Sequence, residues 1–242
     1  MLQIFAIPWR TGRCAALALA MLAVVTAAPA AQQPREPQAQ PPAPQAEATV
    51  ANMAGRTLQV LRDPSLDTAA RQDRLMRVLR DGLDIPTIAR FVMGRHGDQL
   101  SDAQRQRFRA AFGDYVLQTY ASMLARQSVA DITVTDSRKV TETTAAVSTR
   151  VTRDAETEAT WTWRLHARDG RYRIVDLQTS GVSLAVTYRA EFGSELAPGR
   201  LDGVIEQLRE QSAMGGTMRF ERLALTRLLR QFGTGELALT AR

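Results

Sequence analysis

Apolar residues recur at a helical period over the first half of the chain. Between residues 47 and 124 they return every three or four positions, as expected for helices that bury one face. These stripes predict four helices, at 47–61, around 75–79, at 84–92 and at 101–124. Asp84 and Pro86 suit an N-cap and first turn, and Gly94 ends that helix. Ser101 with Gln104 is typical of a capping box at the start of the longest helix.

Beyond residue 131 the period changes to two, which indicates strands. The alternation predicts four of them, at 132–134, 141–153, 158–168 and 172–177. In the third strand, Trp161, Trp163 and Leu165 share one face and Arg164 lies on the other. Asp169-Gly170 predicts a tight turn before the fourth, because glycine tolerates the positive φ that such turns need. Sequential strands joined by short turns favour an antiparallel meander.

The stretch 169–192 is predicted to form a corner between a strand and a helix. Gly181 stops the last strand, and Leu184, Tyr188 and Phe192 then recur at helical spacing. One more amphipathic helix follows at 201–208. Helices before and after an antiparallel sheet predict an α+β fold. We expect one domain at 47–212, with N-terminal helices, a four-stranded twisted sheet and C-terminal helices.

The two ends of the chain differ in composition from this domain. Arg10 and Arg13, the apolar run 14–27 and the small residues 28–30 predict a signal peptide at 1–30. The run is shorter than the roughly 20 residues of a membrane-spanning helix, and an uncleaved anchor is the alternative. Residues 31–46, rich in Pro, Gln and Ala, predict a disordered linker. Residues 213–242 predict a basic amphipathic tail, which either lies on a membrane, docks on the domain or stays loose.

Composition narrows the class of protein. With 242 residues, 45% of them hydrophobic, the chain can bury a substantial core in one domain. The net charge of +6 comes from dispersed residues without a block of like charges, so we expect a solvated basic surface and no nucleic-acid partner. The single cysteine, Cys14, lies in the predicted signal peptide, which leaves the exported chain without disulfides or thiol chemistry.

Residue types with catalytic potential do not gather into a recognisable motif. The two histidines, His96 in a glycine-flanked loop and His166 on the polar face of a strand, are interpreted as solvated. Ser183 lies in G-V-S-L-A, which lacks the second glycine of a nucleophile elbow, and is expected to cap the corner helix. The carboxylates of Asp84, Asp176 and Asp202 are interpreted as capping or turn groups. We therefore predict no enzyme activity, no catalytic residue, no metal ligand and no cofactor.

Residues 83–127 and 172–208 resemble the MlaC family of periplasmic phospholipid shuttles, also called toluene-tolerance auxiliary proteins. The first segment carries the resemblance at Asp84, Ile88, Ala89, Val92, Gly94, Arg95, Gln104, Arg105, Phe108, Phe112, Val116 and Tyr120. The second segment carries it at Tyr172, Ile174, Asp176, Leu177, Gly181, Val182, Ser183, Leu184, Tyr188, Arg189 and Phe192. The helix that follows matches at Asp202, Gly203, Ile205 and Leu208.

The resemblance implies a soluble, monomeric periplasmic carrier whose sheet and helices enclose an apolar cavity for phospholipid acyl chains. Such a carrier passes lipid between an outer-membrane lipoprotein complex and an inner-membrane ABC transporter complex, and so maintains outer-membrane lipid asymmetry. Two alternatives stay open. One is a carrier for another lipid, such as a hopanoid, and the other is a small-molecule enzyme on a similar cone-shaped scaffold.

Candidate lipid contacts are apolar residues expected on inward faces, for which ordinary core packing is the alternative. They are Phe91, Phe112, Tyr115, Val116, Val147, Trp161, Trp163, Ile174, Val182, Leu184 and Tyr188. Guanidinium groups match the geometry of phosphate, so three arginines are candidates for contact with a headgroup or a partner, with surface ion pairing as the alternative. These are Arg95, Arg164 and Arg189.

Overall fold

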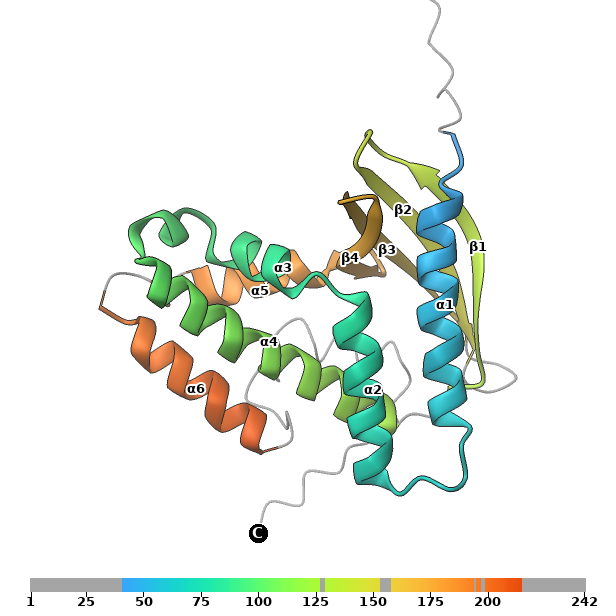
Figure 1. Ribbon diagram of the computed structural model, residues 1–242, viewed down its shortest axis with the longest axis horizontal. Helices are drawn as coiled ribbons and strands as arrows, with labels where there is room; N and C mark the ends of the chain where they lie inside the picture. Colours follow the sequence, from blue (N-terminus) through green and yellow to red (C-terminus); the bar gives the residue numbers. More distant parts are fainter. Residues whose placement is uncertain (1–40, 127–128, 153–157, 194, 197–198, 215–242) are drawn as a thin grey trace, which may run out of the picture. The chain divides into compact units, whose positions relative to one another are not determined.

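The computed structural model describes residues 41–126, 129–152, 158–193, 195–196 and 199–214 (Figure 1). Six α-helices, one 3-10 helix and five strands follow one another in this part of the chain. The helices are α1 (Pro44–Leu61), α2 (Thr68–Gly82), α3 (Ile85–Met93), η1 (Gly94–Gln99), α4 (Asp102–Ala125), α5 (Leu184–Gly193) and α6 (Leu201–Ala213). The strands are β1 (Asp131–Lys139), β2 (Thr144–Thr152), β3 (Glu158–Arg168), β4 (Arg171–Thr179) and β5 (Val182–Ser183).

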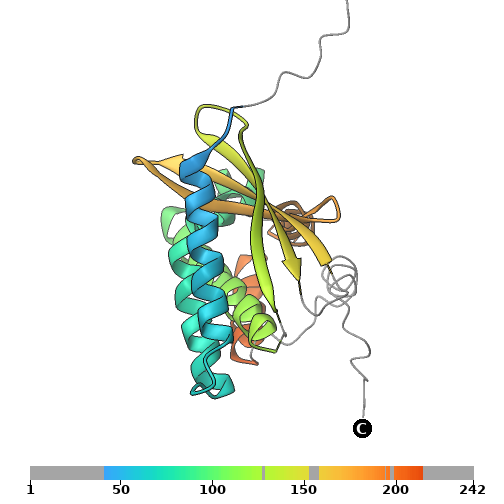
Figure 2. The same cartoon turned by 90° about the vertical axis from the view of Figure 1, so that its right-hand side faces the viewer.

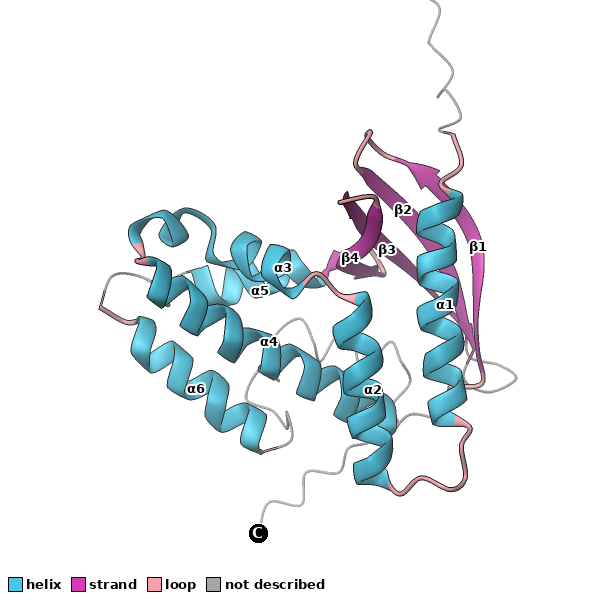
Figure 3. Cartoon of the chain, in the orientation of Figure 1, coloured by secondary structure: helices cyan, strands magenta, loops and turns pink. Residues whose placement is uncertain are grey.

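The strands form one antiparallel sheet in the order β1-β2-β3-β4-β5, which confirms the predicted meander and the α+β class (Figure 3). Asp169 and Gly170 both have positive φ, 52° and 74°, as a two-residue hairpin turn requires. The expected number of four strands is wrong. Val182 and Ser183 add a short fifth strand beside Gln178 and Thr179, because the turn at Gly181 folds the chain back along β4 before α5 begins.

The start of the domain also differs from the prediction. Residues 31–46 were expected to be a linker, but α1 begins at Pro44, and Ala43 and Ala46 are buried. Proline suits the first turn of a helix, where a backbone N–H has no partner within the helix, and alanine is small enough to pack closely. The signal peptide predicted at 1–30 and nearly all of the tail predicted at 213–242 lie outside the described residues.

The helices cover one side of the sheet and also form a bundle beside it. Figure 2 shows α1 running alongside β1, and it contacts β2 as well. Helix α2 packs between α1 and α4, while α4 also contacts α3 and α6. The capping box predicted at the start of α4 is confirmed, because Ser101 Oγ accepts from the Gln104 N–H and the Gln104 side chain accepts from the Ser101 N–H.

Two apolar cores result from this arrangement. The first lies between the sheet and helices α1, α2 and the end of α4, and it includes Leu75, Val147 and Leu165. The second lies among α3, α4, α5 and α6. Its centre is aromatic. The centroid of the Phe112 ring lies 5.6 Å from that of Phe108, and the Phe112 ring meets those of Tyr188 and Phe192 edge-on.

A backbone link joins the helices to the sheet. The Asp84 N–H, between α2 and α3, donates to the Ile174 carbonyl of β4 at 2.8 Å. Leu83 forms a bridge to the same residue. Asp84 also caps α3, because its carboxylate accepts from the Thr87 N–H at 3.1 Å. This junction fixes the end of α2 and the start of α3 against β4.

Candidate functional site

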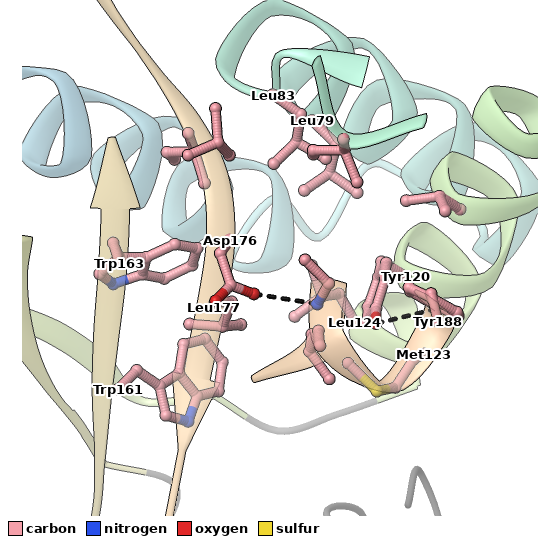
Figure 4. Close-up of a pocket in the computed structure, with 16 residues that line it drawn as sticks. Leu79, Leu83, Tyr120, Met123, Leu124, Trp161, Trp163, Asp176, Leu177 and Tyr188 are labelled. Atoms are coloured by element: carbon pink, nitrogen blue, oxygen red, sulfur yellow. Dashed lines mark hydrogen bonds between the residues drawn. The ribbon is translucent and has the colours of Figure 1, made fainter. Parts of the chain in front are cut away.

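A hollow lies where the two cores meet, between β3 and β4 on one side and helices α2, α3, α4 and α5 on the other (Figure 4). Its volume is about 90 Å³. The wall is almost entirely apolar. It consists of Leu79, Leu83, Ile88, Val116, Tyr120, Met123, Leu124, Trp161, Trp163, Ile174, Val175, Asp176, Leu177, Leu184, Ala185 and Tyr188.

The sheet supplies two indole rings to this wall. Trp161 and Trp163 lie on one face of β3 because side chains two residues apart on a strand point the same way. Their ring centroids are 5.6 Å apart and the ring planes meet at 65°. Trp163 Nε1 donates to Thr149 Oγ1 of β2 at 2.9 Å. This bond satisfies a buried donor and holds the Trp163 ring in its orientation.

The helical wall follows from the spacing of residues on α4 and α5. Val116, Tyr120, Met123 and Leu124 occur at positions three or four apart on α4, so they share one face. The Tyr120 and Tyr188 hydroxyl oxygens are 3.0 Å apart and hydrogen-bonded, which links α4 to α5. In Figure 4 this pair lies across the hollow from the two indole rings.

The corner between β4 and α5 is held by the carboxylate of Asp176. Its Oδ1 accepts from the Ala185 N–H at 3.0 Å, and its Oδ2 accepts from the Ser183 hydroxyl at 2.7 Å. Ser183 Oγ in turn accepts from the Val186 N–H at 3.1 Å. Both side chains thus satisfy N–H groups of the first turn of α5, which confirms the capping role predicted for Ser183.

The tyrosines around the hollow are neutral at physiological pH. Burial raises the pKa of the Tyr188 hydroxyl well above its ordinary value, and the nearby Tyr120 adds to the rise. Burial likewise raises the pKa values of Tyr115 and Tyr120. On α5, burial raises the pKa of Glu191 to about 7, and the charge of Glu195 contributes. The two hydroxyls on the wall therefore keep their protons.

The structure divides the predicted lipid contacts into three groups. Those that line the hollow are Val116, Trp161, Trp163, Ile174, Leu184 and Tyr188. Phe112, Tyr115 and Val147 are not on the wall but are packed inside the cores, each at most 3% exposed. Phe91 and Val182 were expected on inward faces, but each is 39% exposed. Helix α3 buries most of its other apolar side chains, which leaves Phe91 on the exposed side of the helix. Val182 is the first residue of β5, the short strand at the edge of the sheet.

Several wall residues were missed by the predictions. Tyr120, Met123 and Leu124 lie on the apolar stripe of the longest predicted helix, next to Val116, so the spacing could have identified them. Leu79 and Ile88 lie on the stripes of two other predicted helices. Asp176 is different. It is a charged residue on an otherwise apolar wall, and only its capping bonds to the following helix explain its position.

The three candidate arginines do not come together. Arg95 lies in η1, Arg164 on β3 and Arg189 on α5, and none lines the hollow. The Arg189 guanidinium lies 4.9 Å from the centre of the Phe91 ring, a cation–π arrangement. It also covers Gly94, where an added Cβ would lie 3.0 Å from an Arg189 nitrogen. Arg189 therefore joins α5 to the end of α3.

The described part of the chain holds no group of three or more His, Cys, Asp or Glu side chains placed to bind a metal ion. The two histidines lie in separate elements, His96 in η1 and His166 in β3. Each is half-buried, with its Nδ1 atom buried, so both are less solvated than the sequence pattern indicated. Within the same residues, no helix combines the length and apolar character needed to cross a membrane.

Comparison with known proteins agrees with this architecture. The family model for the MlaC protein matches residues 51–210. A solved structure of similar fold is the phospholipid-binding protein from Ralstonia solanacearum in complex with a phospholipid. It matches with a TM-score of 0.61 and 21% sequence identity, over 72% of this chain and 99% of that chain. The match covers the helices and strands that build the hollow, and the chain therefore belongs to the MlaC family.

Proposed function

We propose that this protein is a periplasmic carrier that holds the acyl chains of a phospholipid in the hollow between its sheet and helices. It takes up lipid from one membrane complex and delivers it to another, between the outer membrane and an inner-membrane ABC transporter, and so helps maintain outer-membrane lipid asymmetry. Membership of the MlaC family supports this proposal, as does the phospholipid bound to the Ralstonia protein of similar fold.

The observation that carries the proposal is the chemistry of the wall. Moving hydrocarbon from water onto an apolar surface is favourable, by about 0.8 kcal/mol for each buried methylene. The wall offers indole, aliphatic and thioether groups to such a chain, with Asp176 engaged in capping bonds. No histidine, lysine or cysteine occurs among the described wall residues, so a carrier fits this wall better than an enzyme does.

The size of the hollow implies that it widens when lipid enters. The 90 Å³ hollow is much smaller than the roughly 300–1,000 Å³ of pockets that bury drug-sized ligands, so it accommodates only part of one acyl chain. Each methylene buried there contributes about 0.8 kcal/mol. A whole phospholipid needs more room. We infer that the sheet and the helices α4 and α5 move apart to admit the rest.

Mass spectrometry of lipid that co-purifies with the exported protein tests the ligand. We expect a diacyl phospholipid at about one molecule per protein. A hopanoid or another ring lipid in its place would support the alternative carrier. Protein that contains no lipid, and that takes up none from phospholipid vesicles, would refute the proposal.

The transport role needs a separate test in cells. Loss of the protein should leave phospholipid in the outer leaflet of the outer membrane, detected by surface labelling of lipid headgroups. The wild-type gene should restore the asymmetry. A strain without the protein whose outer leaflet is unchanged would contradict the shuttle, even if the purified protein binds lipid.

A further inference from the structure

Two phenol hydroxyls are placed inside the almost entirely apolar wall of the hollow. Tyr120 comes from α4 and Tyr188 from α5, and their hydroxyl oxygens are 3.0 Å apart (Figure 4). Tyr188 is 5% exposed. The bond between them uses one of the two phenolic protons. No other hydrogen bond of either hydroxyl is found within the described residues, so one donor remains available to a bound molecule.

The surroundings decide which kind of acceptor suits this pair. The wall carries one ionisable carboxylate, Asp176, whose charge is close enough to add to the rise in the pKa of Tyr120 that burial mainly causes. An anionic group such as phosphate would be repelled by Asp176 in this apolar setting. A neutral acceptor would not. Both hydroxyls also keep their protons, so they can donate.

A phospholipid carries neutral acceptors of this kind at the junction between its chains and its headgroup, namely the ester carbonyl oxygens. A carbonyl taken from water into an apolar site without a hydrogen bond is costly. We propose that Tyr120 and Tyr188 open their mutual bond when lipid enters and donate hydrogen bonds to its ester carbonyls. This inference rests on the proposed function. It makes the pair the group that fixes how deep the lipid lies and that favours acyl esters over ether or ring lipids.

Paired lipids provide the test. A diester phosphatidylcholine and the diether analogue with the same chains and headgroup differ only in the carbonyls. Binding is followed by tryptophan fluorescence, because Trp161 and Trp163 line the hollow and the third tryptophan, Trp9, lies in the predicted signal peptide. We expect the wild type to bind the diester more tightly, by roughly 2- to 12-fold for each hydrogen bond. Equal affinity for the two lipids would overturn the inference without any variant being needed.

Variants then assign the preference to the two hydroxyls. Tyr120→Phe and Tyr188→Phe should each reduce the preference for the diester, and the double variant should bind both lipids equally. Tyr115→Phe is the control, because Tyr115 is buried nearby but is not on the wall, and its preference should stay at the wild-type value. If the bond only joins α4 to α5, the variants would weaken binding of both lipids by the same factor.

The outcomes separate this inference from the proposed function. Wild-type protein that binds neither lipid contradicts both. Wild-type protein that binds the two lipids equally contradicts the inference and leaves the carrier intact. A preference for the diester that survives in the double variant also overturns the role of the tyrosines. Thermal unfolding of each variant confirms that the comparison is made on folded protein.

Discussion

Filling the hollow with a side chain tests whether acyl chains occupy it. Ala185 lies on α5, is 7% exposed and lines the hollow. Its neighbour Val186 lies on the outer side of the same helix and is 54% exposed. Ala185→Phe places a phenyl ring in the space that we assign to the lipid, whereas Val186→Phe adds the same ring to the outer surface. The two variants are therefore matched in chemistry and in position along the chain.

The size of the effect follows from the volume of the hollow. A phenyl ring adds six carbon atoms, and the 90 Å³ hollow accommodates only part of one acyl chain, so the ring excludes about as many methylenes as it has carbons. Excluding about six methylenes at 0.8 kcal/mol each removes about 5 kcal/mol of binding free energy, or roughly three orders of magnitude in Kd. Where the ring does not fit the space fully, overpacking costs about 1–3 kcal/mol of stability.

Titration with a diacyl phospholipid, followed by tryptophan fluorescence, measures the change in Kd, and thermal unfolding measures stability. We expect the Ala185→Phe protein to stay folded and lose most of its affinity, while Val186→Phe binds as the wild type does. An Ala185→Phe protein that is folded and binds within twofold of the wild type would refute the reasoning. The acyl chains would then have to lie somewhere else.

Three further predictions concern the supports of the site. Asp176→Ala removes the cap of α5 and should lower the free energy of unfolding by about 0.5–2 kcal/mol in chemical denaturation. Gly94→Ala should lower it by about 1–2 kcal/mol, because φ is 51° and Arg189 covers the position. The raised pKa of Glu191 means that the folded state favours the protonated acid. The melting temperature should therefore fall as pH rises from about 4.5 to about 7, and Glu191→Gln should remove that slope.

Elements whose burial follows from their own sequence were predicted well. The alternation of Trp161, Trp163 and Leu165 places them on one buried face of β3, and the capping box at Ser101 depends on residues three positions apart. Such patterns are local, so the sequence contains what is needed to recognise them. Strand β1 was predicted only at 132–134, because its second half consists of polar residues at an edge of the sheet and carries no alternation.

Part of the wall of the hollow depended on contacts that no local pattern contains. Phe91 has helical spacing with Ile88, but which of them faces inward is set by packing against α5 and by Arg189, far away in the sequence. The bond between Tyr120 and Tyr188 likewise joins residues 68 positions apart. The resemblance to a family indicated the kind of ligand that we propose, whereas the identity of the wall residues also required the arrangement of helices against the sheet.

The backbone bond from Asp84 to Ile174 constrains how a lipid can enter. Ile174 and Leu83 both belong to the wall, so the bond holds the two sides together at that place. While it persists, the junction of α2 and α3 stays against β4, just as the Asp176 bonds hold the start of α5 there. Leu165 of β3 pairs with Ile174, and Trp161 lies four residues from Leu165 on the same strand. Four residues of a strand span roughly 13 Å. We therefore expect the gap to open away from this bond, toward Trp161, and the hydrocarbon tails to enter at that end.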